Sequence, residues 1–381
     1  MLTSILNLPK SRFSGFVAGC AILVSASDGF ASSTLKETFK DHFLLGVAVN
    51  QRQFSEQDAR GTPIVTEQFN SITPENVLKW ESVHPRQGQY NFEPADRFVA
   101  FGAKHGMVII GHTLVWHSQT PRWVFQGEGT NALTREALLQ RMRDHIHTVV
   151  GRYKGRIKGW DVVNEALQDN GRMRETPWFR IIGEDYIAKA FEYAHEADPA
   201  AELYYNDYSL ELESKRKACV ELVKKLQAQG IKVAGIGTQH HNKLASPTLE
   251  QVEKTIVAFG ELGVKVMITE LDVDVVRATQ RNLSADVADV ARAGGGGGNS
   301  TSNTLPESAQ QELAQRYGQL FSMYVKHSDV IDRVTLWGVT DGDSWLNFPG
   351  RVNHPLLFDR EGKPKPAFDA VIKAGLKPVL P

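Results

Sequence analysis

Short apolar runs alternate along most of the chain with longer segments in which hydrophobic residues recur at helical spacing. Eight apolar runs are typical of strands, at residues 43–50, 71–76, 108–116, 157–164, 202–206, 233–241, 266–271 and 333–339. Helical periodicity follows them, for example at residues 135–152, 211–229 and 307–327, and a last helix is expected at about 365–374. Strands that alternate with helices pair in parallel, and eight such repeats close into a barrel. The pattern therefore predicts an α/β protein with a (β/α)8 TIM barrel as its single domain.

One polar segment interrupts this rhythm after the seventh predicted strand. It covers about residues 278–305 and contains the uninterrupted glycine run 294–298. Glycine carries maximal backbone entropy and has no side chain to bury, so the segment is interpreted as a flexible surface insertion. Because it leaves a strand end on the face where barrel enzymes keep their sites, a role in covering a ligand is the alternative.

The first 31 residues have the character of an export signal. Lys10 and Arg12 precede the apolar stretch 16–26, and small residues follow up to Ala31. The apolar stretch is about half of the roughly 20 residues that a membrane-spanning helix needs, so we expect a cleaved signal peptide and no transmembrane span. The remaining chain, residues 32–381, would then be periplasmic or extracellular.

A second way of processing the leader is kept open by Cys20. Residues 17–20 resemble a bacterial lipoprotein processing site, which would leave the protein anchored by a lipid on Cys20. With cleavage near Ala31, Cys219 would be the only cysteine left in the remaining chain, and an intramolecular disulfide would be impossible.

Composition and charge narrow the class of partner. The 381 residues are 41% hydrophobic and 23% charged, which is ordinary for a globular protein with a large core. The formal net charge is -1, so nothing attracts the chain to nucleic acid or to an anionic membrane, and a neutral ligand fits better. The short basic run Lys215-Arg216-Lys217 is interpreted as a solvated helix face. We expect a monomer.

Polar and aromatic residues gather at the carboxyl ends of the predicted strands, where packing alone would favour valine and leucine. They are Asn76 and Lys79 after the second strand, His112, Trp116 and His117 at the third, Asn164 and Glu165 at the fourth, Tyr208 after the fifth, Gln239 and His241 at the sixth, Glu270 and Asp272 at the seventh, and Trp337 and Trp345 at the eighth. In a parallel barrel these ends lie on one rim. The sequence therefore predicts a single site on that rim.

Glu165 and Glu270 are the most informative pair on this rim. Each ends an otherwise apolar run, and an ionised carboxylate in such surroundings is costly unless it is paired or used. Two carboxylates carry out glycoside hydrolysis, in which one attacks the anomeric carbon while the other donates a proton to the leaving oxygen. We expect the negative charge of Glu270 to raise the pKa of Glu165. Once Glu270 is esterified its charge disappears, and Glu165 can act as a base.

Seven segments resemble those of glycoside hydrolase family 10, the endo-β-1,4-xylanases. They are TPENVLKW (73–80), GHTLVWHSQTP (111–121), GWDVVNEA (159–166), YYNDY (204–208), GIGTQHH (235–241), ITELDV (268–273) and LWGVTDGDSW (336–345). They run in family order across roughly residues 36–378. The chain departs from the family pattern at Leu78, at Ser209 and in the glycine-rich insertion, which concerns contacts at the rim rather than the chemistry.

The resemblance implies a retaining endo-1,4-β-xylanase that acts on xylan and xylo-oligosaccharides without a cofactor or metal. It implies that Glu165 is the general acid/base and Glu270 the nucleophile. The residues that it implies for substrate binding are Glu75, Asn76, Lys79, His112, Trp116, Asn164, Tyr208, Gln239, His241, Trp337 and Trp345. Asp272 would orient His241, and His117 would support the site.

Three other functions stay open at this point. A β-1,4-glucanase would share both glutamates, and the sugar-reading residues Lys79, Gln239 and Trp345 favour xylan over glucan. A metal-dependent hydrolase could use imidazole ligands, for which the sequence offers His112, His117, His240 and His241. A carbohydrate-binding protein without activity would keep the aromatic residues and lose a carboxylate, whereas both are present.

Overall fold

The computed structural model describes residues 33–127, 129, 131–276, 302 and 304–376. The predicted signal peptide, with Cys20, and nearly all of the predicted insertion at 278–305 lie outside these residues.

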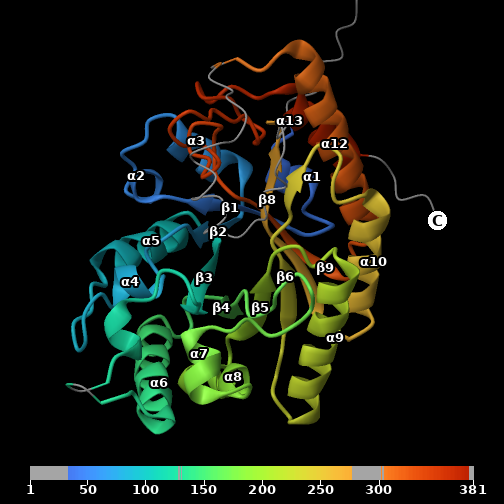
Figure 1. Cartoon of the computed structure of the whole chain (residues 1–381). Helices are drawn as coiled ribbons and strands as arrows, with labels where there is room; N and C mark the ends of the chain where they lie inside the picture. Colours follow the sequence, from blue (N-terminus) through green and yellow to red (C-terminus); the bar gives the residue numbers. More distant parts are fainter. Residues whose placement is uncertain (1–32, 128, 130, 277–301, 303, 377–381) are drawn as a thin grey trace, which may run out of the picture. The chain divides into compact units, whose positions relative to one another are not determined.

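Eight parallel strands close into a barrel (Figure 1). In order around the ring they are β1 (Leu44–Val49), β2 (Ser71–Pro74), β3 (Val108–Val115), β4 (Gly159–Asn164), β5 (Glu202–Asp207), β6 (Gly235–Thr238), β8 (Lys265–Asp274) and β9 (Ile331–Leu336). Pairing of β6 with β8 and of β9 with β1 completes the ring. The predicted (β/α)8 barrel is confirmed.

The sixth predicted strand is broken in two. β6 ends at Thr238, and the separate short strand β7 (His241–Lys243) pairs with β8 farther along. His240 lies in the break with φ at 58°, a left-handed backbone that is uncommon for a residue other than glycine. The side chains of Gln239 and His241 consequently lie on one side of the chain, in a pocket described below, while that of His240 lies on the other side and contacts Tyr324.

Helices cover the outside of the barrel. In chain order they are α1 (Leu35–Thr38), α2 (Gln51–Phe54), α3 (Gly61–Gln68), α4 (Trp80–Val83), α5 (Glu93–Lys104), the 3-10 turn η1 (Arg122–Phe125), α6 (Arg135–Arg152), α7 (Pro177–Ile182), α8 (Tyr186–Ala197), α9 (Glu213–Ala228), α10 (Leu249–Gly260), α12 (Glu307–Lys326) and α13 (Pro366–Gly375). In Figure 1, α9, α10 and α12 lie along one side of the strands and α4 to α8 along the other. The four helices named from the sequence agree with α6, α9, α12 and α13 to within two residues.

Apolar side chains pack in two places. The larger cluster lies mainly between the strands and their helices. Ile110, Tyr204 and Met267, on β3, β5 and β8, form a separate, fully buried cluster. These are the third, fifth and seventh strands of the ring, as expected for side chains that point into a barrel from alternate strands.

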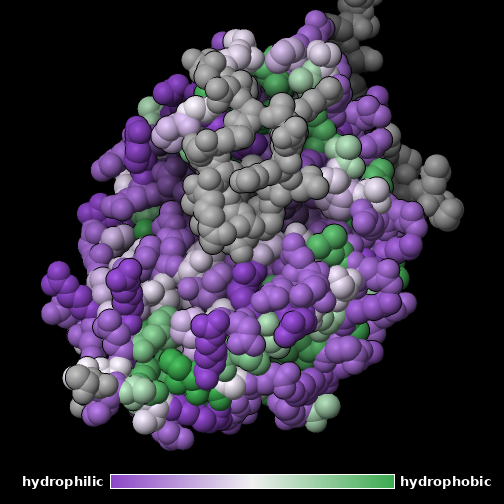
Figure 2. Space-filling view, viewed as in Figure 1, coloured by the Kyte–Doolittle hydropathy of each residue, from purple (hydrophilic) through white to green (hydrophobic). Residues whose placement is uncertain are grey.

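The face of the molecule seen in Figure 2 is mostly polar. Figure 2 shows hydrophilic side chains over α6, α9 and α10, with hydrophobic ones gathered near α7 and α8. Within the ranges that the structure describes, every helix is too short or too polar to cross a membrane.

Candidate active site

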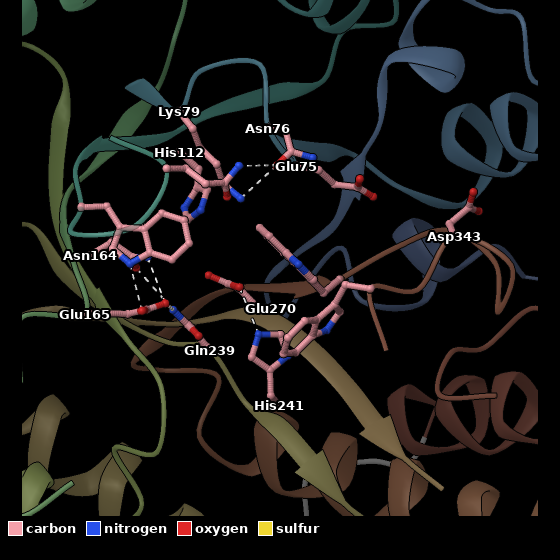
Figure 3. Close-up of a pocket in the computed structure, with 14 residues that line it drawn as sticks. Glu75, Asn76, Lys79, His112, Asn164, Glu165, Gln239, His241, Glu270 and Asp343 are labelled. Atoms are coloured by element: carbon pink, nitrogen blue, oxygen red, sulfur yellow. Dashed lines mark hydrogen bonds and ion pairs between the residues drawn. The ribbon is translucent and has the colours of Figure 1, made fainter. Parts of the chain in front are cut away.

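A polar pocket with tryptophan walls opens at the carboxyl ends of the strands (Figure 3). It is lined by Glu75, Asn76, Lys79, His112, Trp116, Gln119, Asn164, Glu165, Gln239, His241, Glu270, Trp337, Asp343 and Trp345. All of the residues predicted for catalysis or substrate binding, except Tyr208, are in this set. Gln119 and Asp343 were not predicted.

Glu270 lies inside β8 and is held by donors on both carboxylate oxygens. Asn206 Nδ2 donates to Oε1 at 2.9 Å, and His241 Nε2 lies 3.1 Å from Oε2. Burial acts to raise the pKa of Glu270, but the hydrogen bond from His241, the charges of His112 and His241 and the Asn206 bond outweigh it and hold the pKa below its usual value. Glu270 is therefore ionised at neutral pH and able to act as a nucleophile.

His241 is placed between two carboxylates. Its Nδ1 lies 3.1 Å from Asp272 Oδ1, opposite the Nε2 contact to Glu270, and Trp345 Nε1 donates to Asp272 Oδ2 at 2.7 Å. Burial alone would lower the pKa of His241, but Asp272 and Glu270 raise it to about 10. Asp272 is therefore placed to orient His241, and His241 carries a positive charge beside Glu270.

Glu165 follows directly after β4, with its backbone in the left-handed region at φ 58°. Trp116 Nε1 donates to Oε2 at 2.9 Å. Gln239 Nε2 and Asn164 Nδ2 donate to Oε1 at 3.1 and 3.2 Å. The carboxyl group is thereby aimed into the pocket from the opposite side to Glu270, as Figure 3 shows.

The pKa of Glu165 is raised to about 7, chiefly because the carboxyl group is buried. The negative charge of Asp207 is the next cause, and that of Glu270 ranks below the lowering effects of the hydrogen bonds from Gln239 and Trp116. The expectation that the charge of Glu270 raises the pKa of Glu165 is confirmed, but burial and Asp207 are larger causes. Burial and Asp207 act on Glu165 whether or not Glu270 is charged.

Amide side chains connect the two glutamates. Asn206 Nδ2, which donates to Glu270, also lies 2.9 Å from Asn164 Oδ1, and Asn164 donates to Glu165. Thr269 Oγ1 donates to Asn206 Oδ1 at 2.6 Å and fixes the amide orientation. Asn206 was not predicted as a site residue, although its place at the end of β5, two residues before Tyr208, was a signal of the same kind as the others.

Lys79 brings a buried positive charge into the pocket. Its Nζ donates to Asn76 Oδ1 at 3.2 Å and lies 5.1 Å from the centre of the Trp116 ring. Gln119 Nε2 also donates to Asn76 Oδ1, at 3.3 Å. These contacts fix donors at the pocket wall in positions that suit sugar hydroxyls.

Glu75 and Asp343 form a carboxylate pair at the end of the pocket away from Glu165 (Figure 3). The pKa of Glu75 is raised to about 7, first by burial and then by the charge of Asp343. Thr340 donates to Asp343 Oδ2 through its backbone N–H at 3.1 Å and its hydroxyl at 2.7 Å. Asp343 could have been suspected, because it lies in the loop between Trp337 and Trp345.

Three predicted residues lie outside the pocket lining: Asp272, which contacts His241 as described above, Tyr208 and His117. Tyr208 is only 3% exposed, and Arg174 Nη2 donates to its hydroxyl at 2.5 Å. His117 is half-buried beside Trp116, with the two ring centres 6.0 Å apart. Tyr208 therefore offers little exposed surface to a sugar ring in this structure, and its contact with substrate, like the supporting role of His117, stays a prediction.

Of the four histidines considered as metal ligands, His112 and His241 line the pocket, whereas His117 and His240 do not. His112 Nδ1 lies 2.9 Å from Asp161 Oδ2, while His240 Nδ1 lies 2.7 Å from Tyr324 Oη and Nε2 lies 2.9 Å from Glu211 Oε1. Among the described residues, no three or more histidine, cysteine, aspartate or glutamate side chains are grouped to hold a metal ion.

The polar, tryptophan-lined pocket holds a buried carboxyl group with a pKa near 7 on one side and an ionised carboxylate on the other. A barrel with such a pair has the site of a glycoside hydrolase. The sequence profile described as glycosyl hydrolase family 10 matches residues 34–374. The chain belongs to this family.

Curated relatives and solved structures agree with this assignment. The endo-1,4-beta-xylanase A of Xylanibacter ruminicola is 43% identical over 95% of this chain and 99% of its own length. A GH10 endoxylanase retrieved from a sugarcane soil metagenome is 44% identical, and its structure covers 89% of this chain and 99% of its own with a TM-score of 0.83. The intracellular xylanase of Thermoanaerobacterium saccharolyticum, solved as a mutant in complex with xylotriose, is 38% identical and covers 88% of this chain and 97% of its own with a TM-score of 0.77.

Proposed function

We propose that the protein is an endo-1,4-β-xylanase that hydrolyses internal β-1,4-xylosidic bonds with retention of anomeric configuration. The observation that carries the proposal is the opposite shift of two buried glutamates across one pocket: Glu165 has its pKa raised to about 7, and Glu270 has its pKa lowered. Double displacement needs one carboxyl group of each kind. The xylanase relatives support xylan as the substrate.

In the first step, Glu270 attacks the anomeric carbon of the sugar. The bond between this carbon and a Glu270 carboxylate oxygen forms as the bond to the leaving oxygen breaks, and Glu165 gives its proton to that oxygen. The positive charge of His241 beside Glu270 and the amide bond from Asn206 hold the attacking carboxylate in place.

In the second step, a water molecule attacks the anomeric carbon while Glu165 takes a proton from it. The ester to Glu270 breaks, Glu270 regains its charge, and the two inversions give net retention. Because burial keeps the pKa of Glu165 near 7, the same carboxylate is basic enough to accept this proton.

Xylose recognition follows from the walls of the pocket. Pyranose rings present apolar C–H faces that suit Trp116, Trp337 and Trp345, while Lys79 and Asn76 offer partners to hydroxyl groups. Xylose lacks the hydroxymethyl group that glucose carries on C5. We infer that Trp345 stands over this position and excludes glucan by its bulk.

Export is a separate part of the proposal and rests on residues 1–31 alone. A charged start, an apolar core and small residues up to Ala31 support cleavage there, with a lipid on Cys20 as the alternative. N-terminal sequencing of the protein recovered from the producing cells, with mass spectrometry for a lipid, decides between them. Recovery of the uncut chain from the cytoplasm would contradict both.

The first experiment measures reducing ends from β-1,4-xylan and from carboxymethyl-cellulose, with and without chelator. Proton NMR follows the anomeric form of the first product. We expect chelator-resistant release of β-configured xylo-oligosaccharides. Cleavage of glucan alone, activity that needs added metal, or α-configured product would overturn the proposal.

Two variants test the glutamates. Glu165→Ala should keep far more activity on an aryl xylobioside with a good leaving group than on xylan, since the good leaving group needs no proton. Glu270→Ala should lose turnover on every substrate. Equal losses in Glu165→Ala, or efficient retaining turnover by Glu270→Ala, would remove the role concerned.

A further inference from the structure

Lys215 is not part of the solvated helix face that the basic run 215–217 suggested. It is the third residue of α9, and its side chain is fully buried, whereas Lys217 is exposed and pairs with Glu213 one turn earlier. Burying an ammonium group costs several kcal/mol unless partners replace its water. The partners of Lys215 therefore show what the charge is for.

Lys215 Nζ contacts a carboxylate and an aromatic ring at once. It lies 2.9 Å from Asp207 Oδ1, with both side chains fully buried, and 3.5 Å from Asp169 Oδ1. It also lies 3.5 Å from the centre of the Tyr208 ring, a distance at which the cation attracts the ring face. One ammonium group thus neutralises Asp207 and fixes Tyr208.

Asp207 in turn holds the backbone that follows Glu165. Its Oδ2 accepts from the Tyr205 hydroxyl at 2.5 Å and from the Leu167 N–H at 3.3 Å. The Tyr205 oxygen accepts from the Ala166 N–H at 3.1 Å. Ala166 and Leu167 come directly after Glu165, whose own φ of 58° has to be maintained by its surroundings.

We propose that Lys215 is a positioning residue for the acid/base. By neutralising Asp207, Lys215 keeps the turn after Glu165 in place, and it also holds the Tyr208 ring that it contacts. The inference rests on the proposed function, because it presupposes that Glu165 donates the proton.

Lys215 also acts through charge. The charged groups that face Glu165 are Asp207 from β5, Glu270 from β8 and Lys79 after β2. Among these charges, that of Asp207 raises the pKa of Glu165 the most. Lys215 offsets Asp207 at 2.9 Å. Without Lys215, the ionised form of Glu165 faces more uncompensated negative charge, so its pKa should rise.

The test compares Lys215→Met with Lys217→Met, which removes an exposed lysine from the same helix. We measure kcat/KM on xylohexaose and on dinitrophenyl xylobioside, because this ratio reports formation of the glycosyl-enzyme. A misplaced acid should cost Lys215→Met about 10-fold on xylohexaose and less than about 3-fold on the activated substrate. The basic limb of its pH profile should move up by about one unit. Lys217→Met should behave as wild type in both respects.

Equal losses on the two substrates with an unmoved pH profile would show a structural role alone and overturn the inference. If Lys215→Met does not fold, Tyr205→Phe carries the test, because it removes the hydroxyl that links Asp207 to Ala166. It should show the same leaving-group dependence, and equal or no losses would overturn the inference. Glu165→Ala is measured in parallel to distinguish failure of this inference from failure of the proposed function. If Glu165→Ala also loses equal activity on both substrates, the proposed function is wrong.

Discussion

Replacing Trp116 by phenylalanine should move the basic limb of the activity profile to higher pH. The indole N–H donates to Glu165 Oε2 at 2.9 Å, and this bond favours the ionised carboxylate and lowers its pKa. A hydrogen bond to a charged group contributes about 1.5–3 kcal/mol, which corresponds to about 1–2 pKa units. Because the pocket is open to water, which can replace the lost donor, we expect the lower end of this range.

The wild-type limb should lie near pH 7, since the pKa of Glu165 is raised to about 7, and the limb of Trp116→Phe near pH 8 by the hydrogen-bond estimate. The assay is kcat/KM for xylohexaose from pH 4 to pH 10. Trp345→Phe is the matched control, because its indole donates to Asp272 rather than to Glu165, so its basic limb should stay in place. A limb in Trp116→Phe that stays unchanged or moves down would refute the reasoning.

Three further predictions follow from other buried groups. Asp272→Asn should lower the pKa of His241 from about 10, so that a less charged imidazole supports the nucleophile and the acidic limb of kcat/KM moves up; an unmoved limb would contradict this. Asp343→Asn should lower the pKa of Glu75 from about 7, so the pH dependence of KM for xylohexaose between pH 6 and pH 8 should shift downward, and an unchanged KM profile would argue against the pair. Burial lowers the pKa of His84 to about 4 from its model-peptide value of 6.5. Between these two pH values the unfolded chain binds a proton at His84 that the folded chain does not bind. The free energy of unfolding is therefore not reduced by this group above pH 6.5, and it decreases by about 3 kcal/mol as the pH falls toward 4. Urea unfolding of His84→Gln should show a smaller loss between pH 7 and pH 4, and an equal loss would rule this group out.

The barrel and most of the pocket were predictable because they follow from local patterns. Buried parallel strands appear in a sequence as apolar runs, and polar residues stand out where such a run ends, as at Glu165 and Glu270. Parallel pairing brings those ends to one rim without any knowledge of contacts.

The rest depends on tertiary packing that no local pattern records. The break between β6 and β7 is set by contacts of His240 with Tyr324 and Glu211, which are distant in sequence. Lys215 looks the same in the sequence as the exposed Lys217, and only the position of Asp207 makes it a buried residue. The main cause of the raised pKa of Glu165 is its burial, which is likewise a property of the folded chain.

Glu165 follows β4 and Glu270 lies in β8, which are the fourth and seventh strands of a closed ring. The strands therefore determine the spacing of the two glutamates, and the loops determine how much of a polymer is bound. The gap between Glu165 and Glu270 is set by the circumference of the barrel, which its strand pairing fixes. Loops beyond the strands can therefore lengthen, shorten or exchange and alter how much of a polymer is grasped, while the stereochemical outcome at the cleaved bond stays the same.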